Sequence, residues 1–261
     1  MSPSGRKTNP EAVSPHLYDR DYFLGDCGGY ELYKESKGAV LDPRLSILLR
    51  MADIRPGMLV LDVGCGRGEL LRQLAQRGAL AWGLDFSREA LGISKETLEA
   101  GGPVCAHRAA LCEANAQRLP FGSGLFHRVI LSDILEHLTP AQLRFTMAEV
   151  HRVLGNEGLV LFHTFPNRWF YEIFYPFKRL FWDKPRGVAG PRNPRTHYER
   201  VLHVQELSPW DILRSFGALF KVRIWCAHRN RWDQRDGVFK GRLGPLALLM
   251  EPEIWGIAWK R

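Results

Sequence analysis

The stretch VLDVGCGRGELL, residues 60–71, decides the fold of this 261-residue chain. Its first half completes the almost wholly apolar run 58–63, which predicts a strand buried on both faces of a sheet. Its second half opens the run 69–78, whose leucines share one face and which ends at a glycine, as amphipathic helices do. The glycines in between permit a tight turn. The stretch therefore predicts a strand, a glycine-rich loop and a helix in succession.

The same alternation of short apolar runs and amphipathic stretches continues on both sides of this loop. We expect helices at 43–53, 87–102, 140–155 and 208–217, the second and last beginning at serine N-caps. We expect strands at 79–86, 103–107, 127–132, 158–165 and 253–261, with another directly after the helix 208–217. Strands that alternate with helices indicate a mostly parallel sheet with helices on both faces, which is a doubly wound α/β fold.

Acidic side chains stand at the predicted strand ends beside the glycine loop. Asp62 directly precedes the loop, and Asp85 ends the next strand. Bare N–H groups at a helix N-terminus favour an anionic group, but Glu69 stands where a dinucleotide fingerprint has its third glycine. Asp62 suits an ammonium group, and Asp85 is placed to accept both hydroxyls of a ribose. The loop thus favours a ligand with a zwitterionic tail and a ribose over a dinucleotide.

Five motifs, in order, resemble those of the class I S-adenosylmethionine-dependent methyltransferases of the small-molecule and quinone-biosynthesis type. They are VLDVGCGRGELL (60–71), GLDFS (83–87), NAQRLPF (115–121), FHRVILSDILEHL (126–138) and EVHRVLGNEGLVLFHTFPN (149–167). Asn115 and His127 stand where this family usually has Asp, and for His127 we expect only a local packing change. The resemblance implies an enzyme with S-adenosylmethionine as cofactor and S-adenosylhomocysteine as product. It also implies a Rossmann-like sheet with a C-terminal antiparallel hairpin and a helical lid insertion after strand 5.

The resemblance assigns the methionine end of the cofactor to the glycine loop. Gly64, Cys65 and Gly66 would line it, and Asp62 would lie near its amino group. The segment 16–33 is rich in tyrosine, and related enzymes close such a segment over the cofactor. Tyr22 would then cap the methionine carboxylate, although a packing role in a hydrophobic staple is an equal alternative.

The adenosine end is assigned to the next strand ends. Asp85 would bind the ribose hydroxyls, and Phe86 would pack beside the adenine. Asn115 would meet the adenine amino group through its side-chain oxygen, and the Ala116 N–H would serve a ring nitrogen. An Asn oxygen still accepts a hydrogen bond, so the change from Asp weakens this contact without removing it.

Methyl transfer requires mainly that acceptor and methyl are aligned in a dry pocket. Ser132 and Asp133, at the end of the fourth strand, would lie under the sulfonium. If the acceptor is a hydroxyl, a general base helps, and His137 and His163 are the candidates by position, with a structural hydrogen bond as the alternative for each. Glu136 is expected to orient the backbone, and no metal site is predicted.

The charge of the chain points to its acceptor side. There are 36 Lys and Arg against 28 Asp and Glu, a net charge of +8, and the whole excess lies in residues 168–242. Nine of the 18 residues from 165 to 182 are aromatic. Four interpretations of 167–200 stay open: a lid packed on the core and substrate, an interfacial helix on an anionic membrane, a nucleic-acid groove, and an oligomer interface.

Five scattered cysteines without a C-x-x-C pair argue against a disulfide framework and a zinc ribbon. The N-terminus lacks an apolar signal region, and no apolar run is long enough to cross a bilayer. We therefore expect a cytoplasmic protein, with peripheral membrane contact through 167–200 as an alternative, and nucleic acid is not the expected partner.

The expected organisation is a mobile tail, residues 1–15, followed by one methyltransferase domain, 16–261. That domain divides into N-terminal cap helices at 16–55, a cofactor-binding core at 56–166, a lid at 167–202, and a C-terminal helix and strands at 203–261. The expected reaction is methyl transfer to an oxygen of a small or lipid-linked biosynthetic metabolite. The alternatives are an RNA methyltransferase and a non-catalytic cofactor-binding or membrane-docking protein.

Overall fold

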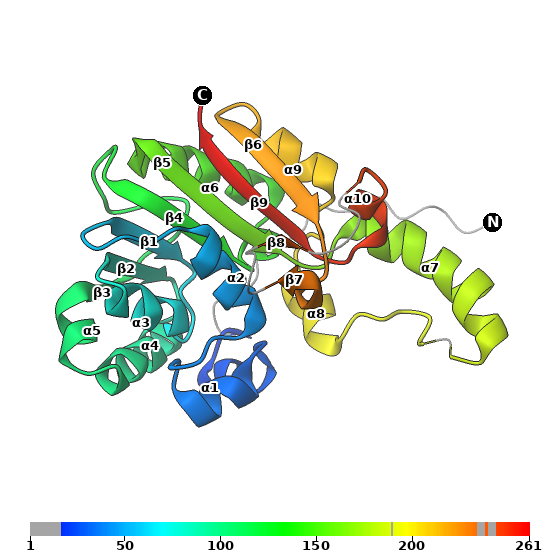
Figure 1. The fold of residues 1–261 in the computed structure, drawn as a ribbon, viewed down its shortest axis with the longest axis horizontal. Coiled ribbons are helices and arrows are strands. Elements are labelled where there is room, and N and C mark those ends of the chain that lie inside the picture. Colours follow the sequence, from blue (N-terminus) through cyan, green and yellow to red (C-terminus); the bar gives the residue numbers. More distant parts are fainter. Residues whose placement is uncertain (1–16, 189, 234–237, 240–243) are drawn as a thin grey trace.

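The computed structural model describes residues 17–188, 190–233, 238–239 and 244–261, so the expected mobile tail 1–15 lies outside the described residues. Seven strands form one sheet in the order β3-β2-β1-β4-β5-β9-β6 (Figure 1). Their bounds are β1 Leu59–Val63, β2 Leu80–Asp85, β3 Ala109–Glu113, β4 Phe126–Ser132, β5 Leu154–Thr164, β6 Phe220–Cys226 and β9 Ile254–Lys260. The first five strands are parallel, whereas β9 runs antiparallel between β5 and β6. A separate pair of short strands is β7 Trp232–Asp233 and β8 Val238–Phe239.

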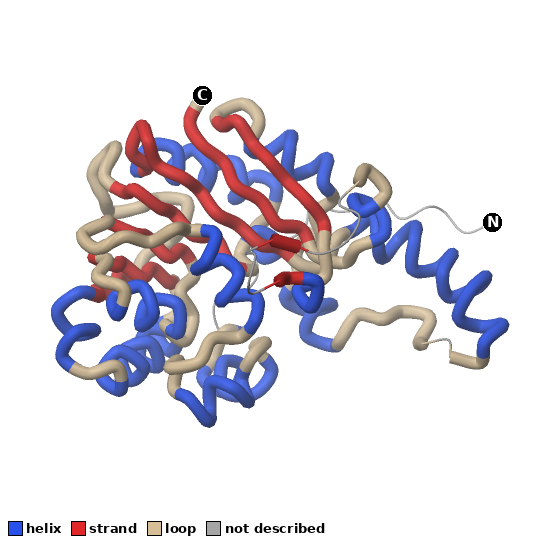
Figure 2. Tube along the Cα trace, viewed as in Figure 1, coloured by secondary structure: helices blue, strands red, loops and turns tan. Residues whose placement is uncertain are grey.

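Helices cover both faces of this sheet (Figure 2). The α-helices are α1 Tyr30–Ser36, α2 Pro43–Met51, α3 Glu69–Gln76, α4 Arg88–Ala100, α5 Pro103–Arg108, α6 Pro140–Val153, α7 Tyr175–Lys178, α8 His197–Leu202, α9 Pro209–Phe216 and α10 Ala247–Met250. The π-helical turns are η2 Tyr22–Asp26, η4 Phe170–Phe174 and η5 Arg179–Asp183. The 3-10 turns are η3 Leu135–His137, η6 Lys184–Arg186 and η7 Arg229–Arg231. Apolar residues of α6 and α9 share one buried cluster, and those of α2 and α3 share another. The predicted doubly wound sheet with a C-terminal antiparallel hairpin is confirmed.

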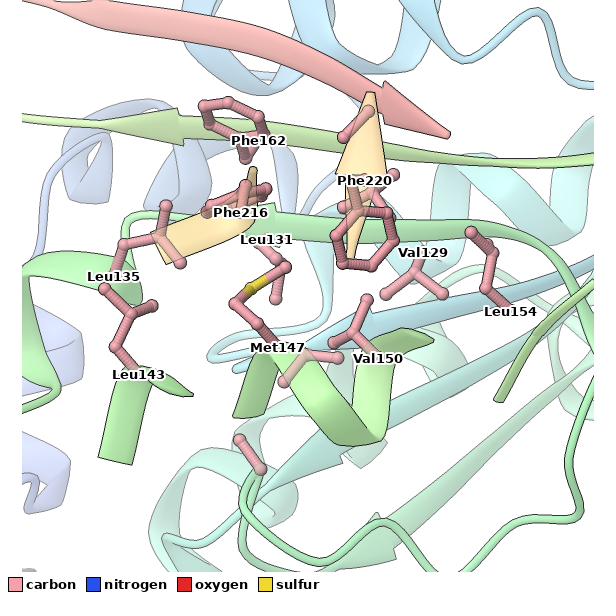
Figure 3. Close-up of a cluster of buried hydrophobic side chains, with 14 of the residues drawn as sticks. Val129, Leu131, Leu135, Leu143, Met147, Val150, Leu154, Phe162, Phe216 and Phe220 are labelled. Carbon is pink, nitrogen blue, oxygen red and sulfur yellow. The ribbon is translucent and has the colours of Figure 1, made fainter. Parts of the chain in front are cut away.

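The alternation of side chains along each strand supplies both clusters. On β4 and β5, Leu131 and Phe162 face α6 and α9, while their neighbours Ile130 and Leu161 face the other layer. Figure 3 shows Met147 of α6 directed at the aromatic rings of this cluster. All five side chains are fully buried. Truncating a buried Leu or Phe to Ala typically costs about 2–5 kcal/mol, so this core holds the strand ends that carry the site.

One predicted strand is wrong. Residues 103–107 are helical and belong to α5, and the strand at this edge is β3, residues 109–113. Pro103 occupies the first helical turn, where its fixed φ is favourable and its missing N–H costs nothing. The predicted helix starts are confirmed, because the Ser87 side chain accepts from the Ala90 N–H and Ser208 caps α9.

The insertion after β5 is helical, as expected. Residues 170–186 form a continuous series of helical turns (η4, α7, η5 and η6), followed by an extended return to α8. We call residues 167–195 the arm. Figure 1 shows that the arm projects away from the sheet and that its return leads back to the sheet's carboxyl edge at α8.

Candidate functional site

A cavity of about 380 Å³ lies at the carboxyl ends of β1, β2 and β4. The order of the strands switches direction here, since β2 and β3 lie on one side of β1 and β4 and β5 on the other. Crossover connections leave a crevice at such a switch point, and ligands bind there. Three chain segments complete its walls: the N-terminal stretch 18–28, residues 196–203 after the arm, and Arg229 after β6. Sequence-distant segments therefore close over the strand ends.

The glycine loop requires glycine for two separate reasons. Gly64, Gly66 and Gly68 all have positive φ values, 75°, 51° and 75°, which side chains rarely adopt. At Gly68 a Cβ atom would also lie 2.8 Å from the Ser94 hydroxyl. That hydroxyl donates to the Gly66 carbonyl over 2.7 Å, so α4 supports the loop from behind. Gly64, Cys65 and Gly66 all line the cavity, and their contact with the methionine part of the cofactor stays a prediction.

Asp85 joins the loop to the second strand end. Its Oδ2 accepts from the Gly66 N–H at 3.0 Å, and its Oδ1 accepts from the Ser87 N–H at 2.9 Å. Burial raises its pKa, and these backbone donors oppose the rise. Each oxygen retains a lone pair for a further donor, such as a sugar hydroxyl. Phe86, exposed at the cavity, packs edge-to-face on Tyr18 with ring centroids 5.2 Å apart.

Asp62 lies at the end of β1 and is nearly inaccessible to solvent, although it lines the cavity. Burial, with a smaller contribution from the negative charge of Asp85, raises its pKa to about 7. A carboxyl group held near neutrality in this way gains strongly from a cation placed beside it. This property matches an ammonium group better than an anion.

Arg67 fastens the N-terminal segment to the glycine loop. Its guanidinium, 3% exposed, donates to the carbonyls of Phe23, Cys27 and Gly28 over 3.0, 3.1 and 2.7 Å. Its Nε lies 2.9 Å from a carboxylate oxygen of Glu69. Glu69 therefore serves as the partner of this arginine, which explains an acidic residue at the place of the third dinucleotide glycine. Tyr22 of the fastened segment lines the cavity.

His137 is held in one orientation by two oxygens. Its Nδ1 lies 2.9 Å from the Tyr18 hydroxyl and 3.0 Å from the Leu202 carbonyl oxygen. Because a carbonyl can only accept, Nδ1 carries the proton and Nε2 keeps its lone pair. Burial lowers the pKa of His137, so the ring is neutral at pH 7. A neutral, oriented imidazole that lines the cavity has the properties of a general base.

Asp133 is the centre of a buried charge network beside Ser132. Its backbone is in the left-handed region, with φ of 51°. Its carboxylate lies 2.6 Å from His163 Nδ1 and 2.8 Å from Arg44 Nη1, and the Ser132 hydroxyl donates to it. Burial opposes ionisation, yet Arg44 and His163 together lower the pKa of Asp133 well below its usual range.

This network removes His163 from the candidates for a base. The ring is fully buried behind Asp133, and it is not among the residues that line the cavity. Its second nitrogen lies 3.7 Å from Glu253 on the other side. Burial lowers the pKa of His163, but the two carboxylates outweigh burial and raise it overall. The ring thus lies between Asp133 and Glu253, and both carboxylates favour its protonated form.

The structure does not bring Asn115 to the cavity. Asn115 is exposed, and its Oδ1 accepts from the backbone and side-chain N–H groups of Gln117 at 2.9 and 3.0 Å. This local turn satisfies the oxygen that was expected to meet the adenine. Ala116 does line the cavity. The hydrogen bond from its N–H to an adenine ring nitrogen stays a prediction. His127 has the local role expected of it, since its Nδ1 accepts from the Leu59 N–H.

Among the cavity residues that were not predicted are Arg44 on α2, Arg229 after β6, and His203 after α8. No local motif marks them, because each becomes functional only through its distant neighbours. Within the described chain, ligand atoms of Glu136, His137 and His203 lie within 4.8 Å of one another, close enough to approach a metal ion.

Glu136 is already engaged as a positioning group. Its carboxylate accepts from the Thr164 hydroxyl at 2.8 Å, and its backbone carbonyl accepts from the Gln205 N–H. Burial and the nearby Asp133 raise its pKa to about 8. Glu136 therefore ties the end of β4 to β5 and to the chain that leaves α8, in line with the expected backbone-orienting role.

Comparison with known proteins finds similarity to methyltransferases over part of the chain. Residues 60–158 match the family described as methyltransferase domain. An uncharacterized methyltransferase of Synechocystis sp. is 40% identical over 131 residues, covering 49% of this chain and 56% of that protein. A ubiquinone biosynthesis O-methyltransferase of Dechloromonas aromatica is 30% identical over 158 residues, covering 59% and 62%. The chain thus spans less than two thirds of the length of these relatives.

Solved structures share the fold over nearly the whole chain. The [4+2]-cyclase SpnF superimposes with a TM-score of 0.63, covering 98% of this chain and 99% of that one at 16% identity. The shared architecture at such low identity concerns the fold alone. The reaction must therefore be argued from the cavity.

Proposed function

We propose that the chain is a class I S-adenosylmethionine-dependent methyltransferase and that it transfers a methyl group from that cofactor to an oxygen of a small or lipid-linked biosynthetic metabolite, as its similarity to methyltransferases supports. The observation that carries the proposal is the pairing of Asp62 and Asp85 at adjacent strand ends around the glycine loop, within one cavity. When bound, the cofactor supplies an electrophilic methyl group on a sulfonium, which is a good leaving group.

The cavity residues fit this cofactor at both ends. Asp62 would hold the ammonium of the methionine part, and its raised pKa means that the cation ionises it on binding. Asp85 would bind the ribose hydroxyls with the lone pairs left by Gly66 and Ser87. Phe86 would cover the adenine. Positive-φ glycines let the backbone approach the ligand without a Cβ atom in between.

On the acceptor side, His137 would take the hydroxyl proton at Nε2. The hydrogen bond to the Leu202 carbonyl fixes the tautomer, and Tyr18 restrains the ring from the N-terminal segment. The charge that develops on the imidazole would be stabilised by Asp133, which also raises the pKa of His137 by its field. The segment 18–28, fastened by Arg67, would exclude water from the reacting atoms.

The choice of oxygen as the methyl acceptor is supported by this neutral, oriented histidine and by relatives named as O-methyltransferases. A lipid-linked acceptor would bring residues 167–200 against a membrane. Methylation of RNA and cofactor binding without catalysis are the competing outcomes.

Calorimetry with S-adenosylmethionine and S-adenosylhomocysteine tests the first part of the proposal. Both compounds should bind. If neither of them binds, the cofactor assignment is refuted. The second part needs a panel of hydroxylated aromatics, carboxylated carrier thioesters, lipid extracts and RNA, incubated with methyl-labelled cofactor. Label in an O-methylated small molecule or lipid supports the proposal, whereas label in RNA alone, or binding without any transfer, refutes it.

A further inference from the structure

The outer face of the arm exposes large apolar side chains at helical spacing. Ile173, Phe177, Leu180 and Phe181 recur every three or four residues or stand next to one another. Their exposed fractions are 54%, 59%, 50% and 62%, and the adjacent Trp182 is 61% exposed. A continuous set of this kind on a projecting helix is unusual for a water-exposed surface and marks an interaction site.

The inner face of the same helix is polar and already engaged. Tyr175 donates to the Pro191 carbonyl and Arg179 donates to the Gly190 carbonyl, each over 2.8 Å. Lys178 lies 2.6 Å from the Asp183 carboxylate. The bonds of Tyr175 and Arg179 attach the returning chain to the polar side of the helix, whereas the Lys178 pair lies within the helical turns. The helix is therefore amphipathic with its apolar side outward, the reverse of a helix that packs on its own core.

Exposed cations follow the apolar residues in the sequence, and one of them contacts an exposed aromatic ring. Lys184, Arg186 and Arg192 are exposed, and the Arg186 guanidinium lies over the Trp182 ring at 4.1 Å. Among the described residues 170–188, Glu172 is the exposed acidic side chain, since Asp183 is buried against Lys178. Lys and Arg beside Trp and Phe are the composition of interfacial helices, and each cation near an anionic lipid surface contributes about 1 kcal/mol.

The arm leads directly to the cavity. Arg195, at its end, lies over the Tyr171 ring at 5.1 Å, and its guanidinium is paired with Glu206. The next residues, 196–203, form the cavity wall that carries Leu202 and His203. A molecule held in a membrane under the arm would thus reach the cavity past this wall.

We propose that the outer face of the arm docks on an anionic lipid bilayer, an inference that rests on the proposed function for its choice of a lipid-linked acceptor. No helix of the described residues is long and apolar enough to span a membrane. The helix would lie in the interface, with Phe177, Phe181 and Trp182 among the acyl chains and the cations at the headgroups. Charge complementarity selects this occupant, and one projecting helix offers only a small area to a protein partner.

Flotation with two kinds of vesicle tests the docking. Vesicles of phosphatidylcholine with 30% phosphatidylglycerol should carry the full chain upward, and pure phosphatidylcholine vesicles should carry much less. Binding to the anionic vesicles should fall as salt is raised from 50 to 500 mM, because salt screens the headgroup attraction but not the apolar contact. Charge reversal in Lys184→Glu and Arg186→Glu should weaken binding to anionic vesicles alone.

A matched pair of variants locates the docking face. Phe181→Ser with Trp182→Ser should lower the fraction bound about tenfold or more, since two exposed aromatic side chains lose their apolar environment. Phe145→Ser with Trp210→Ser removes the same residue types at 61% and 60% exposure, but outside the arm, and should leave binding unchanged. Calorimetry with S-adenosylmethionine should give the same affinity for both double variants.

The outcomes separate the docking from the reaction. A protein that binds the cofactor but not anionic vesicles overturns the docking alone, and one that binds vesicles but not the cofactor overturns the proposed function alone. Equal loss in both double variants also overturns the docking. If the arm variants instead lose binding to single-stranded RNA while vesicles never bind, the arm is a nucleic-acid surface.

Discussion

The glycine-loop wall and the arm use similar residue types in opposite ways. In the wall, charged groups such as Arg67 and Glu69 are buried and paired, and aromatic rings such as Phe23 face inward. In the arm, the rings of Phe177, Phe181 and Trp182 are exposed to solvent, and the Arg186 guanidinium lies over the Trp182 ring. Buried charges require defined partners, so these pairs hold the wall in one arrangement around the cavity. An exposed amphipathic face tolerates many small changes, so the arm determines where the protein binds rather than which atom reacts.

The largest effect should come from the acceptor side of the cavity. His137→Ala should lower kcat by about 100-fold to 10,000-fold, the range for loss of a general base, while leaving the Kd for S-adenosylmethionine unchanged. The measurement is single-turnover transfer of labelled methyl, with calorimetry beside it. Tyr18→Phe is the milder companion, because Leu202 still fixes the tautomer. Full activity of His137→Ala would show that methyl transfer does not require His137 as a base.

The buried clamp of the wall should matter next. Arg67→Ala leaves the Glu69 carboxylate buried without its partner, so the free energy of unfolding should fall by about 3–5 kcal/mol. Urea unfolding followed by far-UV circular dichroism measures this change. Arg20→Ala is the control, because its ion pair with Glu96 is exposed and should contribute nothing measurable. Equal stability of the two variants would mean that the N-terminal segment is not fastened through Arg67.

Cofactor affinity should fall by about 100-fold in Asp85→Ala. The variant loses charged hydrogen bonds to the ribose, worth roughly 1.5–3 kcal/mol each, and frees the N–H groups of Gly66 and Ser87. Calorimetry measures the affinity, with Asp53→Ala as the control, since that carboxylate pairs on the surface with Arg55. If Asp85→Ala binds the cofactor as well as the unaltered protein does, the ribose does not bind at this strand end.

The smallest expected effect is a pH dependence at Asp62. Its pKa is raised from the usual 3.8 to about 7, so the folded protein holds more protons than the unfolded chain between about pH 4 and 7. Stability should therefore fall as the pH rises through this window. Cofactor affinity should do the opposite, rising up to about tenfold per pH unit below 7 and then levelling off, because the ammonium requires the ionised carboxylate.

Asp62→Asn separates these two effects. It should raise the melting temperature at pH 8 by removing a buried charge, and it should weaken cofactor binding and flatten its pH dependence. Thermal melts and calorimetry between pH 5.5 and 7.5 provide both readouts. A pH-independent affinity in the unaltered protein would contradict the assignment of the ammonium to Asp62.

Predictions from the sequence succeeded where the chemistry is local. The glycine loop, Asp62 and Asp85 lie within one strand–loop–helix unit and the strand beside it, so spacing alone brings them together. Ser87 and Ser208 marked helix starts because capping is a contact between near neighbours. The prediction of an edge strand at 103–107 was wrong because this segment is too short to show a hydrophobic period. Pro103 begins a helix there instead.

The other errors concern side chains whose partners are distant in sequence. His163 was a candidate base because it stands near a strand end, but Asp133 and Glu253 enclose it. Asn115 matched a family position, but a turn with Gln117 occupies its oxygen. For His203 no signal exists in the sequence, since only the return from the arm brings it beside His137.

The sequence by itself determined the alternation of strands and helices outside 103–113, the glycine loop with its two carboxylates, and the location of the excess positive charge. Those features depend on periodicity, backbone freedom and composition, all of which are local properties of the chain. Tertiary structure alone decided that His137 lines the cavity while His163 does not, and that Phe177, Phe181 and Trp182 of the arm are exposed to solvent. Burial and partner choice depend on which distant segments meet, and only the folded chain brings those segments together.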